Sequence, residues 1–373
     1  MTVTFLSLAD QVRELRPQLD EAMRRVLDSG WFLLGKELEA FEGEFAAYVQ
    51  AKHCAGVANG LDALHLALKA CGIGPGDEVI VPSNTYIATW LAVSQVGAVP
   101  VPVEPIPGTC NLDAARISAA ITPRTRAVMP VHLYGQPCDL DAILAVTRPR
   151  GLRVIEDAAQ CHGARWRGKR IGAHGDAVAW SFYPTKNLGA LADGGAVTTD
   201  DAQLAERIRV LRNYGQRERY ICEVQGLNSR LEELQAAVLR AKLVRLDEWN
   251  ARRTRLAARY LAELAGLPGL VLPTVAPGAE PVWHLFTVRH ARRDALKAAL
   301  LAAGVQTIVH YPIPPHRQQA YAGLGLAAGS LPIAEAIHRD ILSLPIGPHL
   351  SDDGAGQVIA AVREACNALA AAG

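Results

Sequence analysis

The chain has 373 residues, half of them hydrophobic and a fifth charged, so it is long enough for two domains that each bury a core. Its net charge of +1 argues against a nucleic-acid surface, and without a long apolar run or a signal peptide we expect a cytoplasmic protein with no membrane contact. The seven cysteines are scattered without close pairs, which argues against a disulfide framework and a zinc site, so we expect no metal.

The N-terminal stretch predicts helices at residues 7–28 and 36–49, joined by a glycine-bracketed apolar loop. A strand at 53–58 then leads into Asn59-Gly60 and a helix. Asn59 is a good N-cap, and Gly60 lets the backbone approach a ligand closely. Free N–H groups at such a helix start form a phosphate site, although an Asn-Gly pair is more often only a cap.

Short apolar strands then alternate with helices, which predicts a mainly parallel sheet covered by helices. Tyr86 follows the first of these strands, where its ring could stack on a flat ligand or pack in the core. The fourth strand ends in Glu156-Asp157, and Gln160 follows. The strands are predicted at 78–81, 99–103, 127–131 and 153–157, and the helices at 87–96, 113–121 and 140–147.

A strand at 177–182 is followed by Pro184, which cannot pair in a sheet, so the chain leaves the sheet there. Lys186 then lies on a loop beyond the carboxyl end of a strand, where ligands bind open α/β sheets. A desolvated lysine has a lowered pKa and can act as a nucleophile, although a lysine considered alone is more often solvated. The strand at 194–199 follows too soon for a parallel crossover, so we predict that it is antiparallel.

A helix at 202–212, a polar loop at 217–231 and a helix reaching about residue 252, capped by Asn228 or Ser229, follow. Glycine and proline between residues 266 and 281 indicate a second domain. That domain is predicted to contain a strand at 283–289, a strand-like run at 305–311, and helices at 292–303, 334–341 and 352–371.

These elements predict an α/β protein with two domains. The large domain, residues 1–250, is expected to be a three-layer α/β/α sandwich around a mixed, mainly parallel sheet of seven strands. The small domain, residues 251–373, is expected to be α+β.

Three stretches carry a family resemblance: Glu156-Asp157-Ala158-Ala159-Gln160, residues 181–187 and residues 226–231. Together they resemble pyridoxal phosphate (PLP) enzymes of the aspartate aminotransferase fold, and more narrowly the DegT/DnrJ/EryC1/StrS sugar aminotransferase family. The match runs from about residue 30 to the C-terminus. The departures remove no catalytic group; they are Thr185, Ala192 and Cys161.

The resemblance implies that Lys186 holds PLP as a Schiff base and moves the proton during transamination. Asp157 would pair with the pyridine nitrogen and raise its pKa, and Gln160 would hydrogen-bond the phenolic oxygen. Some dehydratases of the family carry histidine at the lysine position, so Lys186 argues against dehydration chemistry.

The resemblance also implies how the rest of the cofactor is bound. Backbone N–H groups of Gly60 and Leu61, assisted by the Ser181 hydroxyl, would hold the phosphate, and Tyr86 would stack on the ring. Asn228 would reach the phosphate of the neighbouring subunit, which implies a homodimer with shared active sites.

Four stretches resemble the branch of the family that acts on dTDP-3-keto-6-deoxyhexoses: residues 82–90, 132–137, 282–286 and 310–316. They imply that L-glutamate donates its amino group, leaving 2-oxoglutarate, to C3 of such a dTDP-linked ketosugar. The product would be a dTDP-3-amino-3,6-dideoxyhexose for deoxyaminosugar biosynthesis. The alternatives are a 4-aminotransferase acting on a 4-keto-6-deoxysugar nucleotide and a non-catalytic regulator. A nicotinamide-dependent oxidoreductase does not fit, because no G-x-G-x-x-G follows the first strand.

Five residues are predicted to bind the sugar nucleotide. Tyr183 and Tyr220 could supply hydroxyls for the hexose, and Arg219 could pair with the diphosphate. His310 and Tyr311 precede a stiff proline-rich loop that could hold them at the pocket mouth, or they could simply pack between the domains.

Overall fold

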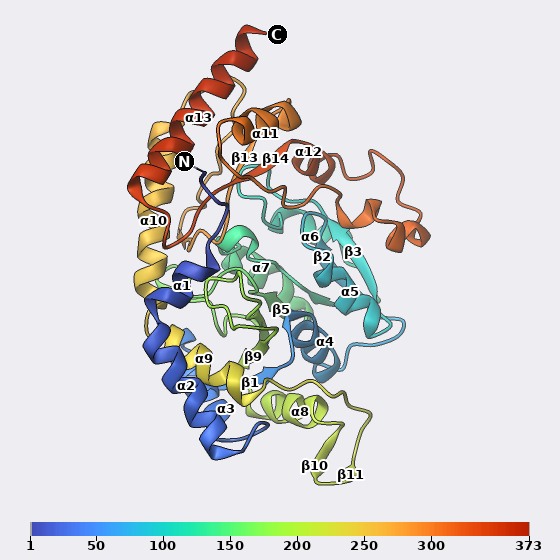
Figure 1. Ribbon diagram of the computed structural model, residues 1–373. Coiled ribbons are helices and arrows are strands. Elements are labelled where there is room, and N and C mark those ends of the chain that lie inside the picture. The colour runs from blue at the N-terminus through green and yellow to red at the C-terminus, as the bar shows by residue number, and fades with distance from the viewer. Residues whose placement is uncertain (1, 373) are drawn as a thin grey trace.

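The computed structural model describes residues 2–372, and a seven-stranded sheet lies at the centre of that part of the chain (Figure 1). The strand order is β1-β9-β8-β5-β4-β2-β3, and β9 runs antiparallel to both of its neighbours while the other pairs are parallel. The predicted α/β fold with a mixed, mainly parallel sheet is therefore confirmed. The strands are β1 (His53–Val57), β2 (Glu78–Pro82), β3 (Val99–Val103), β4 (Thr125–Val128), β5 (Arg153–Asp157), β8 (Ala177–Ser181) and β9 (Gly195–Thr199).

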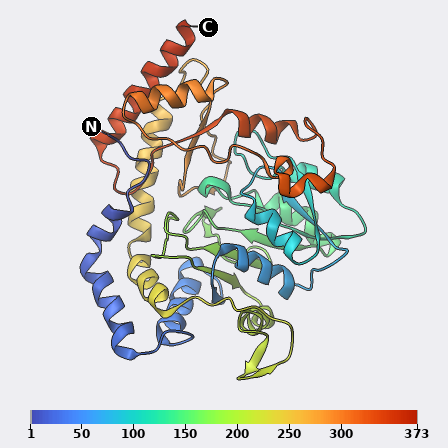
Figure 2. The same ribbon diagram turned by 45° about the vertical axis from the view of Figure 1, so that its right-hand side comes forward.

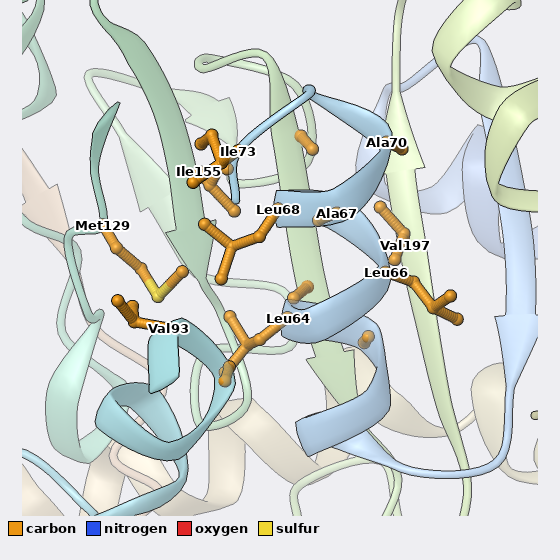
Figure 3. Packing of buried hydrophobic residues seen from close by; sticks show 14 of the residues in the cluster. Leu64, Leu66, Ala67, Leu68, Ala70, Ile73, Val93, Met129, Ile155 and Val197 are labelled. Atoms are coloured by element: carbon orange, nitrogen blue, oxygen red, sulfur yellow. The ribbon is translucent and has the colours of Figure 1, made fainter. Parts of the chain in front are cut away.

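Helices cover both faces of this sheet, because its strands are apolar on both sides. One face packs against α4, α5 and α8, and Figure 3 shows Leu64 and Leu68 of α4 pointing toward Met129 and Ile155 of the sheet layer. The other face packs against α3, α9, α6 and α7. These helices are α3 (Lys36–Val49), α4 (Gly60–Ala70), α5 (Ala88–Gln95), α6 (Ala114–Ala120), α7 (Leu140–Thr147), α8 (Ala202–Arg212) and α9 (Glu233–Leu243).

A separate apolar core forms in the C-terminal part, where β13 (Phe286–Arg289) pairs antiparallel with β14 (Ile341–Leu344). The long helix α10 (Leu246–Glu263) connects this core to the sheet region (Figure 1). It crosses the predicted domain boundary at residue 250, so the division into 1–250 and 251–373 stays a prediction. The core is completed by α11 (Arg293–Ala302) and α13 (Asp352–Ala371).

The remaining elements are short or peripheral. They are α1 (Leu8–Glu14), α2 (Arg16–Ser29), β6 (Arg165–Trp166), β7 (Lys169–Arg170), β10 (Gln216–Glu218), β11 (Ile221–Cys222), β12 (Ala279–Glu280), α12 (Pro332–Asp340) and four 3-10 helices at Leu133–Gly135, Arg148–Arg150, Pro315–Arg317 and Gln319–Leu324. No helix within residues 2–372 is long and apolar enough to cross a membrane.

Two contacts hold the C-terminal segment against the sheet layers. The Glu104 carboxylate, after β3, accepts hydrogen bonds from the backbone N–H groups of Ile333 (3.0 Å) and Ala334 (3.0 Å) at the start of α12. Tyr321 inserts its ring into the core beneath α5, and its hydroxyl lies 3.1 Å from the Ser94 hydroxyl. These contacts hold α12 against the end of β3 and Tyr321 against α5.

Several predicted boundaries are wrong, and proline explains two of them. The helix expected at 7–28 is broken after Glu14, because Pro17 has no N–H for the continuing hydrogen bond. Strand β4 ends at Val128 rather than residue 131, since Pro130 interrupts the ladder and Val131 forms only an isolated bridge with Asp157.

The other wrong boundaries have no such local signal. The helix expected to reach residue 252 divides at Val244 and Arg245 into α9 and α10. Both helices share apolar clusters near their junction, and only the later part of α10, from Leu256 onward, packs in the C-terminal core. Neither Asn228 nor Ser229 caps it: α9 starts after Glu232, and the Ser229 hydroxyl accepts from the Ala58 N–H instead (3.1 Å). The polar loop contains the β10–β11 hairpin. The run at 305–311 forms no strand, although Ile308 bridges Ser343 in β14, a strand that was not predicted.

Candidate active site

Lys186 lies on a tight loop that follows β8. Its backbone N–H donates to the Tyr183 carbonyl (2.8 Å), and Ala190 closes the loop by donating to the Phe182 carbonyl (2.7 Å). The side chain is half-buried, and desolvation lowers the pKa of its amine to about 8, against the opposing attraction of Asp157. About a tenth of the amine is therefore neutral at pH 7, far more than for an ordinary lysine, and the neutral form is the one that a nucleophile requires.

Asp157, the last residue of β5, is buried beside this loop. One carboxylate oxygen accepts a hydrogen bond from the Thr89 hydroxyl (2.9 Å) and the other from the Ala159 N–H (3.2 Å). The Thr85 hydroxyl donates in turn to Thr89 (2.9 Å). Burial raises the pKa of Asp157 despite these bonds and the charge of Lys186, and a further cation beside the carboxyl group would stabilise its ionised form. Sequence reasoning missed the two threonines, because hydroxyls in a helix start have many other uses.

A second buried acid supports the end of β5 from behind. Because the Cys138 N–H donates to His132 Nδ1 (3.0 Å), the ring proton must be on Nε2, which donates to Glu156 (2.9 Å). The Gly175 N–H donates to the other oxygen of Glu156 (2.6 Å). Burial is the largest single effect and would raise the pKa of Glu156, but the hydrogen bonds from His132 and Gly175 and the electrostatic effect of His132 and His174 together outweigh it, so the pKa is lowered. Glu156 is thus an ionised, fully hydrogen-bonded carboxylate whose role is structural.

Gln160 connects this edge of the sheet with the C-terminal segment. Its Oε1 accepts from the Tyr134 N–H (2.6 Å), and its Nε2 donates to the Tyr311 hydroxyl (3.1 Å). The Tyr311 ring lies 5.1 Å from the ring of Tyr86, which is 53% exposed and leaves a flat face open. Tyr311, Gln160 and Tyr86 are therefore brought together, although 225 residues separate the first from the last.

His310 lies beside them, with its Nδ1 2.9 Å from the Ser343 hydroxyl. Burial and the charge of Lys186 lower the pKa of His310 to about 4, so its imidazole is neutral. The predicted alternative, packing between the domains, describes one side of these rings. His310 is also close enough to Lys186 for the charge of that lysine to lower its pKa.

The start of α4 lies next to Ser181. Asn59 caps the helix, its Oδ1 accepting from the Asp62 N–H (2.8 Å), so the N–H groups of Gly60 and Leu61 have no partner within the helix. A Cβ atom on Gly60 would lie 2.6 Å from the Ser181 Cβ, which shows how closely the two backbones approach and why glycine is required. Backbone donors at a helix start beside a hydroxyl suit a phosphate group.

Three predicted site residues lie elsewhere on this chain. Arg219 and Tyr220 belong to the β10–β11 hairpin, which projects from the body of the molecule in Figures 1 and 2. There the guanidinium of Arg219 lies over the Tyr220 ring (4.8 Å), and Tyr220 is 81% exposed. Asn228 is exposed on the following loop and bridges Asn213. Tyr183 is exposed next to Lys186.

Metal chemistry has no matching arrangement among residues 2–372, where no group of three or more histidine, cysteine or acidic side chains is placed to hold an ion. The site instead combines a partly neutral lysine, a buried acid, an oriented amide, an open aromatic face and a helix start. Those are the groups that a phosphorylated pyridine aldehyde needs.

Comparison with known proteins points the same way. The family model described as "DegT/DnrJ/EryC1/StrS aminotransferase family" matches residues 14–363. The dTDP-3-amino-3,4,6-trideoxy-alpha-D-glucose transaminase of Streptomyces venezuelae is 60% identical over 97% of this chain and 96% of its own.

Two solved structures extend the likeness to three dimensions. S. venezuelae DesV in complex with a ketimine intermediate superposes with a TM-score of 0.97 at 59% identity, covering 98% of each chain. The ntda protein of Bacillus subtilis with bound cofactor PMP gives a TM-score of 0.91 at 32% identity, covering 98% of this chain and 85% of its own.

Proposed function

Because the chain belongs to the DegT/DnrJ/EryC1/StrS family and is a PLP-dependent aminotransferase, we propose that it aminates C3 of a dTDP-3-keto-6-deoxyhexose with L-glutamate as donor. The observation that carries the substrate is the 60% identity to a transaminase named for a dTDP-3-amino sugar. That relative is named for a 4-deoxy sugar, so the substrate class includes both 4-hydroxy and 4-deoxy members.

The residues of the site fit PLP. The Lys186 amine would bind it covalently, and the Gly60 and Leu61 N–H groups with the Ser181 hydroxyl would hold its phosphate. Burial raises the pKa of Asp157, and a protonated pyridine nitrogen beside it would favour its charged form. Tyr86 offers its exposed ring face for stacking.

When bound, PLP supplies an electron sink for the carbanion formed at the α-carbon of the amino donor. The Lys186 amine then acts as the base that removes the Cα proton, and its pKa of about 8 suits that role near neutral pH. Thr89 and the Ala159 N–H keep the Asp157 carboxylate aligned, so no reorganisation is needed as charge develops. Tyr311 and Tyr134 hold Gln160 from two sides.

The active unit is proposed to be a cytoplasmic homodimer with composite sites. Asn228, Arg219 and Tyr220 are exposed on one segment, and the apolar loop at 29–35 is also exposed, with Trp31 at 63%. A two-fold interface would carry each segment to the partner's Lys186 loop reciprocally. In that arrangement Arg219 would meet the diphosphate and Tyr220 the hexose, with Tyr183, His310 and Tyr311 supplied by the other chain.

The substrate is tested by incubating the PLP-loaded protein with L-glutamate and three ketones: a dTDP-3-keto-6-deoxyhexose, its 4-deoxy counterpart and dTDP-4-keto-6-deoxyglucose. Mass spectrometry detects the amine, and NMR of the product locates the nitrogen. We expect amination at C3, accompanied by 2-oxoglutarate, and none with Lys186→Ala. Amination of the 4-ketosugar alone would establish a 4-aminotransferase, and no amination of any ketone would favour a regulatory protein.

A further inference from the structure

Tyr134 occupies an unusual backbone conformation next to the site. Its φ is +60°, in the left-handed region that side chains other than glycine rarely adopt, and it is buried within the 3-10 helix Leu133–Gly135. Such a conformation costs about 1 kcal/mol and persists where surrounding contacts require it. Three hydrogen bonds surround it here, and two of them reach residues of the site.

The backbone N–H of Tyr134 determines which way the Gln160 amide points. An N–H can only donate, so the atom facing it at 2.6 Å must be the Gln160 oxygen. The amide nitrogen is thereby turned toward Tyr311, where one of its two hydrogens is used at 3.1 Å. The second hydrogen is left for the cofactor. If the amide were reversed, it would present an acceptor to the cofactor's oxygen and repel it.

The phenol of Tyr134 contacts the C-terminal segment. Its hydroxyl donates to the His310 carbonyl (2.7 Å), one peptide before Tyr311. Burial raises the pKa of this phenol far above its ordinary value, so the hydroxyl stays protonated and keeps donating. The Tyr311 carbonyl is held by His338 Nδ1 (2.7 Å), and the Tyr134 carbonyl accepts from the Leu285 N–H (3.2 Å).

We propose that Tyr134 is a positioning residue that links the two halves of the reaction: its N–H orients Gln160 toward the cofactor, and its hydroxyl fixes the His310–Tyr311 backbone that faces the sugar. This inference rests on the proposed function, because it assigns His310 and Tyr311 to the sugar side. A residue that only fills space would use its ring against Leu285, Ile337 and Ile341, which Tyr134 also contacts, and would not need its hydroxyl.

Tyr134→Phe removes the hydroxyl and keeps both the ring and the N–H. The matched control is Tyr260→Phe, because the buried Tyr260 hydroxyl also donates to a backbone carbonyl, that of Pro345 (2.9 Å), in the C-terminal core. Each half-reaction is followed separately by absorbance in single turnovers. Loss of one neutral hydrogen bond should lower kcat/KM of the sugar half-reaction roughly 3- to 10-fold in Tyr134→Phe. The glutamate half-reaction and both rates of Tyr260→Phe should stay within about twofold of wild type, a smaller change than one such bond gives.

The proposed orientation of Gln160 by the Tyr134 N–H is tested by the visible spectrum of the bound cofactor. Gln160→Glu keeps an acceptor for the Tyr134 N–H but replaces the donor with an oxygen. We expect its absorption maximum, or the pH at which the band titrates, to shift, whereas Tyr134→Phe keeps the wild-type spectrum. An unshifted Gln160→Glu spectrum would overturn the claim that the Gln160 amide nitrogen faces the cofactor.

Equal slowing of both half-reactions in Tyr134→Phe, or a sugar half-reaction no slower than in Tyr260→Phe, would show a purely structural role. The wild-type rate with each ketone tests the proposed function. The ratio of kcat/KM for the sugar half-reaction in Tyr134→Phe to that in wild type tests the positioning role of Tyr134. If only a 4-ketosugar reacts, the ratio is measured with that sugar. If no sugar reacts, the assignment of the Tyr134 hydroxyl to a sugar half-reaction is rejected. The spectra still test whether the Tyr134 N–H orients Gln160 toward the cofactor.

Discussion

Lys186 has two protonation states within the pH range of cells, since desolvation lowers the pKa of its amine to about 8. Only the neutral amine attacks an aldehyde, so the rate at which the PLP-free protein captures PLP should rise with pH. We expect half of the plateau rate near pH 8 and roughly a tenth of it at pH 7, one pH unit below the pKa. Stopped-flow absorbance measures the rate directly.

Asp157→Asn gives an internal check on that profile. The Asp157 carboxylate is the group that raises the pKa of Lys186 against desolvation, so its removal should move the midpoint of capture to lower pH. A midpoint above pH 10 in wild type, where an ordinary lysine titrates, would mean that Lys186 is solvated and not the reactive amine.

His162 makes a pH-dependent contribution to stability. It is fully buried, with ring centroids 5.3 Å from Trp180 and 5.8 Å from Phe182, and burial lowers its pKa to about 3. Between pH 6.5 and 3, His162 is protonated in the unfolded chain but neutral in the folded chain. Its contribution to the free energy of unfolding is therefore fully present above pH 6.5 and is lost as the pH falls. The loss at pH 5.5 is about 1.4 kcal/mol.

His162→Phe should therefore reduce the fall in the free energy of unfolding between pH 7.5 and pH 5.5 by about 1 kcal/mol. Urea denaturation at both pH values, with the midpoint and the slope fitted together, is the measurement. An unchanged fall would show that other groups account for the acid sensitivity.

At the scale of elements, α9 supports the loop that carries Lys186. Lys242, on α9, is buried and donates from Nζ to the Gly189 carbonyl (2.7 Å), and burial lowers its pKa to about 8. Gly189 in turn packs on Pro184 so closely that a Cβ would lie 2.4 Å from the Pro184 oxygen. A buried lysine with one acceptor is costly, which suggests that its contact with the loop matters more than stability alone.

Lys242→Met keeps an apolar chain of similar length and deletes this hydrogen bond. We expect faster hydrogen exchange at the Ala190 N–H, which closes the loop, and PLP capture slowed roughly 3- to 10-fold, as for one lost hydrogen bond. Mass-spectrometric exchange and capture kinetics check both. The control is Lys297→Met on α11, an exposed lysine whose loss should change neither. Normal exchange at Ala190 in Lys242→Met would remove this role.

At the scale of the whole molecule, shared sites make a complementation test possible. If Asn228 serves the partner's site, a mixed dimer of Lys186→Ala and Asn228→Ala chains contains one site with both residues intact. Random exchange of equal amounts makes half of the dimers mixed, so about a quarter of all sites become intact. Activity should rise well above the average of the two parents, measured after subunit exchange is verified.

The control mixes Lys186→Ala with chains that carry both substitutions, because no intact site can form from that pair. If activity in the first mixture does not exceed the average of the parents, each chain uses its own Asn228, and the composite site is wrong.

Elements with strong local signals could be predicted from the sequence, because their causes lie within a few residues. The helices at 36–49, 140–147 and 202–212 and the strand at 99–103 were predicted with the observed bounds, since apolar spacing and caps are local. Pro184 placed Lys186 beyond the sheet edge for the same reason. The family, the PLP dependence and the seven-stranded mixed sheet followed from these motifs and are confirmed.

Contacts between distant segments were decided only by the tertiary structure. The hydrogen bond from Gln160 to Tyr311 spans 151 residues, and that from Thr89 to Asp157 spans 68. The pairing of β13 with β14 joins residues that are 52 to 58 positions apart, from Arg289 with Ile341 to Phe286 with Leu344. Such contacts depend on which surfaces meet after the chain folds. The local sequence around a residue is the same whether or not a distant partner contacts it, so it does not reveal that partner. The sequence therefore determined the family and the fold, while the tertiary structure decided which distant residues contact the candidate site.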